Sequence, residues 1–201
     1  MKYEEFTSLI PLKGRTSLFS FVMKGRTMTE GHVLEFGVFK GTSINFLAKL
    51  CPGQTLYGFD SFEGLPEPWQ MAPNKSCRKG HFNLAGQPPM VSANVKLIKG
   101  LFIDSLTPWK KDHLGEKISV LHIDSDLYSS AKYVLTNLDD MIVSGTIIVF
   151  DELCNFDPGG YYSNWEEGEW KALNEWESEI GRELKAMART DKQQGAVLVV
   201  K

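Results

Sequence analysis

Short apolar runs alternate along the chain with segments in which apolar residues recur every three or four positions. The runs at 32–38, 54–60, 95–100, 118–124 and 145–152 have the length of β-strands. The segments of helical periodicity predict helices at 42–51, 105–113, 129–142 and 168–181. Two last runs, 183–189 and 196–201, flank a polar turn and predict a hairpin.

This order of elements predicts an α/β fold. Strands that are apolar throughout and alternate with helices form a parallel sheet with helices on both faces. We therefore expect one domain over residues 1–201, built on a doubly wound, mostly parallel seven-stranded sheet that ends in an antiparallel hairpin. Ligands of such sheets bind beyond the carboxyl ends of the strands.

One segment, 63–93, carries no clear periodicity and is rich in Pro and Gly. A loop of this length in a compact domain is typically a functional lid or a disordered segment. We expect it to be a lid over the ligand site.

Acidic residues stand at the ends of several predicted strands. Asp124 and Asp126 follow the run 118–123, and Asp151 and Glu152 end the run 145–152. Like charges that are brought together repel, and a buried carboxylate needs a partner. The pattern therefore predicts that some partner neutralises these acids.

The first strand leads into a turn that contains Gly37 and Gly41 and is preceded by Glu35. Its spacing differs from the G-x-G-x-x-G fingerprint, so we expect a ligand without a pyrophosphate. Asp60, at the end of the second strand, is placed to bond both hydroxyls of a ribose. The alternative is that the glycines only form a tight turn and that Asp60 caps the next segment.

Composition narrows the class of protein. The net charge is −3, and no basic run exceeds two residues, which is against nucleic acid or an anionic membrane as a partner. Three distant cysteines indicate neither a disulfide framework nor a Cys-rich zinc site. The first residues lack the basic start and apolar core of a signal peptide, and no apolar run reaches membrane-spanning length. We expect a cytoplasmic enzyme.

Longer motifs make the assignment specific. The strings "LEFGVFKGTS", "GFDSFEGLPEPW" and "LHIDSDLYSS" resemble the macrocin/mycinamicin-type sugar O-methyltransferases, a family of class I S-adenosylmethionine-dependent enzymes. The resemblance implies a Rossmann-like methyltransferase fold and S-adenosylmethionine as the methyl donor, with a small-molecule acceptor. It implies that the cofactor-binding residues are Glu35, Gly37, Gly41, Thr42, Ser43, Asp60, Ser61, Phe62, Gly100, Phe102 and Asp124.

The same resemblance implies that a divalent metal is held by Asp124, Asp151 and Glu152. Oxygen ligands without soft neighbours favour magnesium or manganese over zinc. The second acid pair is Asp-Glu here, where family members often have Asp-Asp. By resemblance Asp124 is also the base. Two neighbouring hydroxyls of a sugar or a catechol would chelate such a metal, so we expect a vicinal diol acceptor.

Several residues keep two interpretations. Asp126 is a helix cap, an indirect support or a metal ligand, and His81 is a second base or a surface residue. His122 is expected to be a paired core histidine. Tyr161, Tyr162 and Trp165 form either a wall of the substrate site or ordinary packing.

Three other classes of function compete with this one. The D-x-D motif of residues 124–126 also occurs in metal-dependent glycosyltransferases, but that assignment leaves Glu35 and Asp60 without a role. A noncatalytic adenosine-binding module leaves the acids at the ends of the strands 118–124 and 145–152 without a role. A nucleic-acid methyltransferase lacks support because the chain has no basic surface pattern. A homo-oligomer stays open.

Overall fold

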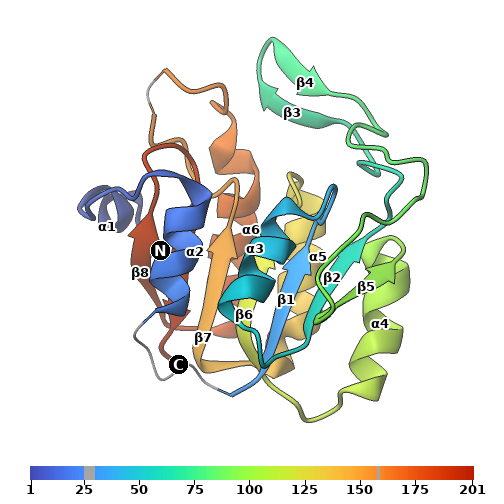
Figure 1. Ribbon diagram of the computed structural model, residues 1–201. Coiled ribbons are helices and arrows are strands. Elements are labelled where there is room, and N and C mark those ends of the chain that lie inside the picture. Colours follow the sequence, from blue (N-terminus) through green and yellow to red (C-terminus); the bar gives the residue numbers. More distant parts are fainter. Residues whose placement is uncertain (25–29, 158) are drawn as a thin grey trace.

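A seven-stranded sheet forms the centre of the protein in the computed structural model, which describes residues 1–24, 30–157 and 159–201 (Figure 1). The strand order is β5-β2-β1-β6-β7-β9-β8. The first five run parallel, and β9 is antiparallel to both of its neighbours. The bounds are β1 (His32–Phe36), β2 (Leu56–Asp60), β5 (Val95–Lys99), β6 (Ile118–Ile123), β7 (Ile142–Phe150), β8 (Leu184–Arg189) and β9 (Gly195–Val199). The predicted fold class is confirmed.

Helices cover both faces of this sheet (Figure 1). α2 (Gly14–Met23) and α3 (Thr42–Leu50) pack on one face through side chains such as Phe19 and Leu47. α4 (Phe102–Asp112), α5 (Tyr128–Leu138) and α6 (Glu169–Ile180) pack on the other, joined by the short α1 (Tyr3–Thr7). The two apolar cores explain why the parallel strands are apolar on both sides.

Some element bounds differ from the sequence prediction. The helix expected at 129–142 ends at Leu138 and continues as a 3-10 turn, η1 (Asp139–Met141). β7 then begins at Ile142, before the expected 145, because Ile142 pairs with Ile118 of β6. α1 and α2 were not predicted, and α4 begins at Phe102 instead of 105.

The segment 63–93 is not wholly irregular. It contains a two-stranded antiparallel hairpin of β3 (Trp69–Ala72) and β4 (Lys75–Cys77), which projects above the carboxyl ends of the sheet (Figure 1). Trp69 and Met71 are buried in a small apolar cluster with Leu65, Leu127 and Tyr162. The hairpin is thus attached to the loops that follow β6 and β7, where a lid would be expected.

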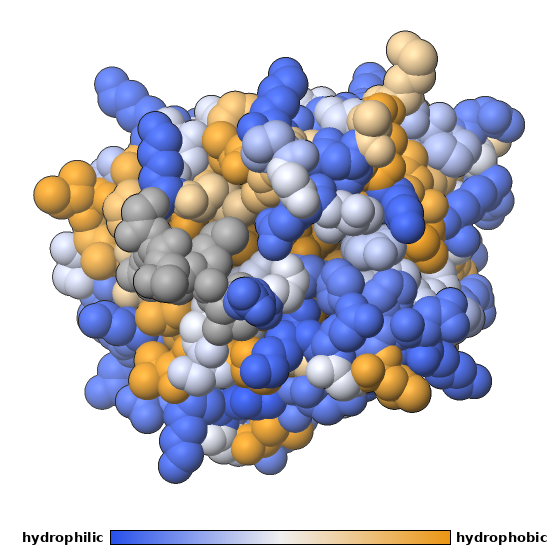
Figure 2. Space-filling model, turned by 60° about the horizontal axis from the view of Figure 1, so that its bottom comes forward, coloured by the Kyte–Doolittle hydropathy of each residue, from blue (hydrophilic) through white to orange (hydrophobic). Residues whose placement is uncertain are grey.

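The opposite end of the molecule carries the amino ends of the parallel strands. Figure 2 brings this end forward and shows mainly hydrophilic side chains, with hydrophobic ones in separate small groups. Among the described residues, no helix is long and apolar enough to cross a membrane.

Candidate active site

The turn between β1 and α3 is held by Asp60. One carboxylate oxygen, Oδ2, accepts hydrogen bonds from the backbone N–H groups of Val38 and Phe39, both at 2.8 Å. The other, Oδ1, accepts one from the N–H of Phe62 at 2.7 Å. A carboxylate offers about four acceptor positions. Three are used, so at least one remains free for a ribose hydroxyl, and the bonding of both hydroxyls by Asp60 stays a prediction.

Gly37 is required where β1 ends beside β6. Its φ is +96°, and a Cβ at this position would overlap the backbone carbonyl of Asp124. Any other residue would strain the backbone and force the two strand ends apart. The glycine therefore brings the turn and the acid of β6 together. Gly41 caps α3 with a φ of +78°.

Glu35 lies behind the turn and is fully buried. Its two carboxylate oxygens pair with the Ser43 hydroxyl and with His122 Nδ1, each at 2.9 Å. Glu35 is absent from the lining of the pocket, so its direct contact with the cofactor remains a prediction that this position does not favour. It positions Ser43, which does line the pocket. His122 is paired on one side, as expected, but its Nε2 has no hydrogen-bond partner.

A pocket of about 680 Å³ opens at the carboxyl ends of the strands. Pockets of this size suit small-molecule ligands and cofactors. Most of the residues expected to bind cofactor or metal line it: Gly37, Thr42, Ser43, Asp60, Ser61, Gly100, Phe102, Asp124, Asp151 and Glu152. Gly41, Phe62 and Glu35 do not line the pocket. Phe62 is fully buried and belongs to the apolar core.

The acids predicted from the strand ends converge on one side of this pocket. Burial, and then the charge of Asp151, raises the pKa of both Asp124 and Glu152 well above the usual range. Burial and Asp151 also raise the pKa of Asp126 to about 7. Burial and mutual repulsion thus make the ionised forms of these acids costly unless a cation lies beside them.

The guanidinium of Arg15 contacts two of these acids. Its Nη1 donates to Asp124 Oδ2 at 2.5 Å, and its Nε lies 3.0 Å from Asp151 Oδ1. Although burial lowers the pKa of Arg15, the charges of Asp151 and Asp124 raise it. Arg15 comes from the first turn of α2, a helix that the sequence pattern missed, so no signal in the sequence placed it here.

Comparison with known proteins identifies the relatives of this chain. The profile of the macrocin O-methyltransferase (TylF) family matches residues 22–162. The chain belongs to this family. No curated protein matches it in a direct sequence search.

Solved structures with a similar fold support the assignment. The calicheamicin methyltransferase CalS11 has a TM-score of 0.67 at 20% identity, over 90% of this chain and 75% of CalS11. The O-methyltransferase NovP has a TM-score of 0.60 at 18% identity, over 92% and 78%. The S-adenosylhomocysteine-bound PaMTH1 of Podospora anserina has a TM-score of 0.55 at 16% identity, over 97% and 84%. At these identities the likeness concerns the fold.

The protein is thus a methyltransferase of the macrocin O-methyltransferase family, as its motifs suggested. This assignment is against the glycosyltransferase and the noncatalytic module as alternatives. Methyltransferases of this kind bind their cofactor at the turn after β1, which the glycosyltransferase interpretation left without a role.

This methyltransferase supports its acids with residues that sequence reasoning missed. The buried Glu169 of α6 accepts hydrogen bonds from the backbone N–H groups of Ser125 and Glu152, at 3.2 and 3.1 Å. It therefore ties together the loops after β6 and β7. Gln193, in the β8–β9 turn, donates to Glu152 Oε1 at 3.0 Å. The polar turn was predicted, but its contact with the acids was not.

Asp126 does not act as the helix cap that the sequence suggested. α5 begins at Tyr128 after Leu127, and no side chain caps it. The backbone turns at Asp126, which has a φ of +62°, and its side chain lines the pocket. It therefore faces the ligand site, while the neighbouring Ser125 pairs with Glu169.

The aromatic residues after β7 have separate roles. Tyr161 lines the pocket, whereas Tyr162 is buried against Trp69 with ring centroids 5.5 Å apart. Tyr162 and Trp165 belong to the packing of the β3–β4 hairpin. His81 is exposed, does not line the pocket and packs against Phe82. Its role as a second base remains a prediction that this position does not favour.

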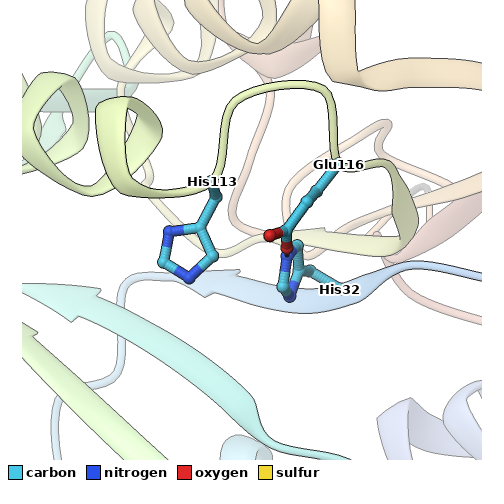
Figure 3. A group of neighbouring side chains, drawn as sticks. All are labelled: His32, His113 and Glu116. Carbon is cyan, nitrogen blue, oxygen red and sulfur yellow. Dashed lines mark hydrogen bonds and ion pairs between the residues drawn. The ribbon is translucent and has the colours of Figure 1, made fainter.

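A second group of polar side chains lies at the other end of the sheet (Figure 3). His32 Nε2 contacts the Glu116 carboxylate, which follows α4. His113 Nδ1 lies 2.7 Å from the Trp109 carbonyl oxygen, and its Nε2 lies 3.2 Å from the Tyr57 hydroxyl. These polar atoms already have partners within the protein. The group ties β1 and β2 to the turn after α4, away from the pocket.

Proposed function

We propose that this chain transfers a methyl group from S-adenosylmethionine to a hydroxyl of a small molecule, and that it requires a divalent metal. The observation that carries the proposal is a single pocket. It extends from the turn after β1, which Asp60 holds, to the acids Asp124, Asp151 and Glu152. The family assignment supports methyl transfer to oxygen. CalS11 is described as a TDP-rhamnose 3'-O-methyltransferase, and the similar fold of TomG was solved with S-adenosylmethionine.

The residues present fit the cofactor at the first part of the pocket. Asp60 keeps one acceptor position free for a ribose hydroxyl, and Ser43 and Thr42 offer hydroxyl groups at the start of α3. Gly100 and Phe102, after β5, supply the wall next to Asp60. We infer that the adenosine lies here, with the reacting end toward Asp124.

The residues also fit a hard divalent cation at the second part. His122, Asp124 and Asp151 each place one potential ligand atom within 4.8 Å of the others. Buried Glu152 Oε2 and His122 Nε2 lack hydrogen-bond partners, and Asp151 Oδ1 has an ion pair with Arg15 but no hydrogen bond. Carboxylate oxygens are the ligands that magnesium and manganese prefer. Asp124 and Asp151 of this group would hold the ion, together with Glu152, which follows Asp151 in the chain and lines the same pocket.

The chemistry then follows from the position of Asp124. S-adenosylmethionine would supply an electrophilic methyl group and leave as S-adenosylhomocysteine, and a divalent cation would lower the cost of deprotonating an acceptor hydroxyl. Asp124 lines the pocket and takes the proton of that hydroxyl at a carboxylate oxygen. The pocket walls orient the acceptor oxygen toward the methyl carbon. Two adjacent hydroxyls suit the row of acids, so we propose a vicinal diol on a sugar or a glycosylated natural product.

Calorimetric titration with S-adenosylhomocysteine tests the cofactor part. We expect binding, and Asp60→Ala should weaken it by about 1.5–3 kcal/mol, the range for hydrogen bonds to charged groups. Asp104→Ala, which changes an exposed acid of α4, is the matched control and should leave affinity unchanged. Equal affinities for the protein and for Asp60→Ala would refute this placement.

A further inference from the structure

Arg15 contacts the ends of two neighbouring strands, β6 and β7, at the point where a metal is expected. It hydrogen-bonds Asp124 at the end of β6 through Nη1 at 2.5 Å and forms an ion pair with Asp151 at the end of β7 through Nε at 3.0 Å. Asp151 is 4% exposed, so its charge gains little from water. The guanidinium thus acts as the cation for two carboxylates that would otherwise repel each other.

The same oxygens are those that a divalent cation between the strands would use. A guanidinium and a metal ion are both positive, and neither Asp124 Oδ2 nor Asp151 Oδ1 can serve both from one side. We propose that Arg15 and the divalent cation are alternative partners of these two acids. The inference rests on the metal dependence proposed above, and it assigns Arg15 a function in controlling that site.

The local structure allows the exchange without rearranging the fold. α2 is anchored by its buried apolar residues, among them Leu18, Phe19 and Val22. The Arg15 side chain is 37% exposed and lines the pocket, so its guanidinium can turn toward solvent while the helix stays in place. A long, flexible side chain pays a modest entropic cost to hold one position and regains that freedom on release.

The exchange has a consequence for metal affinity. In the metal-free protein the acids are already paired, so a cation must compete with Arg15 before it binds. Removing the guanidinium should therefore tighten metal binding. We expect Arg15→Gln to bind manganese at least about tenfold more tightly than the unaltered protein, a factor that corresponds to about 1.4 kcal/mol of lost competition.

The experiment is a calorimetric titration with manganese alone, without cofactor, on the full chain. The matched control is Lys192→Gln, which removes a positive charge from the same pocket lining but from a residue outside the Asp124 and Asp151 pairs. Arg15→Lys keeps the charge but loses the forked guanidinium that reaches both acids. Its affinity for manganese should therefore lie between those of the unaltered protein and Arg15→Gln. Circular dichroism checks that each variant is folded.

The outcomes separate this inference from the proposed function. Tighter binding by Arg15→Gln than by Lys192→Gln supports the exchange, even if the unaltered protein binds no manganese at all. Equal affinities in the unaltered protein and Arg15→Gln overturn the exchange but leave metal dependence intact. If Arg15→Gln and Lys192→Gln gain the same affinity for manganese, the effect comes from the net charge of the pocket, and the exchange is also overturned. If no variant binds manganese, the exchange and the metal requirement both fail, while the S-adenosylhomocysteine titration still decides methyl transfer.

Discussion

At the scale of single residues, the acids of the pocket differ in what surrounds them. Asp124 faces the pocket and contacts Arg15, whereas Glu152 is buried and receives a hydrogen bond from Gln193. Glu152 therefore has less access to an acceptor in the pocket. This difference separates a residue that both holds a metal and takes a proton from one that only holds the metal.

Two substitutions should reveal that difference. Asp124→Asn leaves a neutral amide that cannot accept the proton, so the rate of methyl transfer should fall by about 10²–10⁴-fold and added magnesium should restore little of it. Glu152→Gln keeps the base, so high magnesium should recover much of the rate. Rates are measured against magnesium concentration, with an acceptor found by screening vicinal diols. Full recovery of Asp124→Asn by magnesium would show that the base lies elsewhere.

At the scale of elements, the close approach of β1 to β6 sets the geometry of the site. Gly37→Ala should lower the free energy of unfolding by at least about 2 kcal/mol, because the new Cβ meets the Asp124 carbonyl and the backbone is left-handed. S-adenosylhomocysteine affinity should fall as well. Gly53→Ala is the control, since nothing lies within 4 Å of a Cβ there and φ is not positive. Urea unfolding and calorimetry compare the two, and equal stabilities would contradict this account of the turn.

The hairpin of β3 and β4 is the second element on which the site depends. One small apolar cluster, a backbone hydrogen bond from Asn164 to the Met71 carbonyl and the contact of Lys75 with the Tyr161 ring attach it to the loops beside the pocket. Because these contacts are few, we predict that it opens locally without ligand. Amide hydrogen exchange in 63–93 should slow when S-adenosylhomocysteine and acceptor are added together. Exchange in β6, which lies inside the sheet, is the internal reference. Equal protection of 63–93 with and without ligands would be evidence against a lid.

The elements also show what the sequence could predict. Strands such as β6 could be predicted because all residues from Ile118 to Ile123 are buried, and a strand that is buried on both faces appears in the sequence as a mainly apolar run. The start of β7 was missed because Ser144 and Gly145 interrupt its apolar run, although Ile142 already pairs with β6. Asp124, Asp151 and Glu152 were found since parallel strands end at one edge. Arg15 and Glu169 were not, because helix residues reach that edge only through tertiary packing.

At the scale of the whole molecule, the pocket concentrates negative charge that the fold must tolerate. Asp124, Asp126, Glu152 and Glu169 all have pKa values raised by burial, and the Arg15 guanidinium opposes the shift at Asp124 and Asp126. A site of this kind favours ligand binding over stability. The metal-free protein should therefore be less stable where these acids are ionised.

Asp126 gives the sharpest test of this cost, because its pKa rises from 3.8 to about 7 in the folded protein. A raised pKa means that the folded state holds the proton more tightly than the unfolded chain does. The protonated Asp126 carboxyl therefore adds to the free energy of unfolding. This contribution is fully present below pH 3.8 and is lost as pH rises through about 7. The loss amounts to about 4 kcal/mol at most, since one pKa unit corresponds to about 1.36 kcal/mol. Asp126→Asn cannot ionise and should escape this loss.

The measurement is the free energy of urea unfolding at pH 5 and pH 8, with a chelator present so that no divalent cation binds. Asp126→Asn should be more stable than the unaltered protein at pH 8, and the difference should shrink at pH 5, where the native carboxyl is protonated. Asp104→Asn, at an exposed position of α4, should show no such pH-dependent gain. The same difference at both pH values would mean that Asp126 does not carry a raised pKa. Magnesium in place of the chelator should then stabilise the unaltered protein at pH 8 more than at pH 5, because the ionised acids are the form that binds a cation.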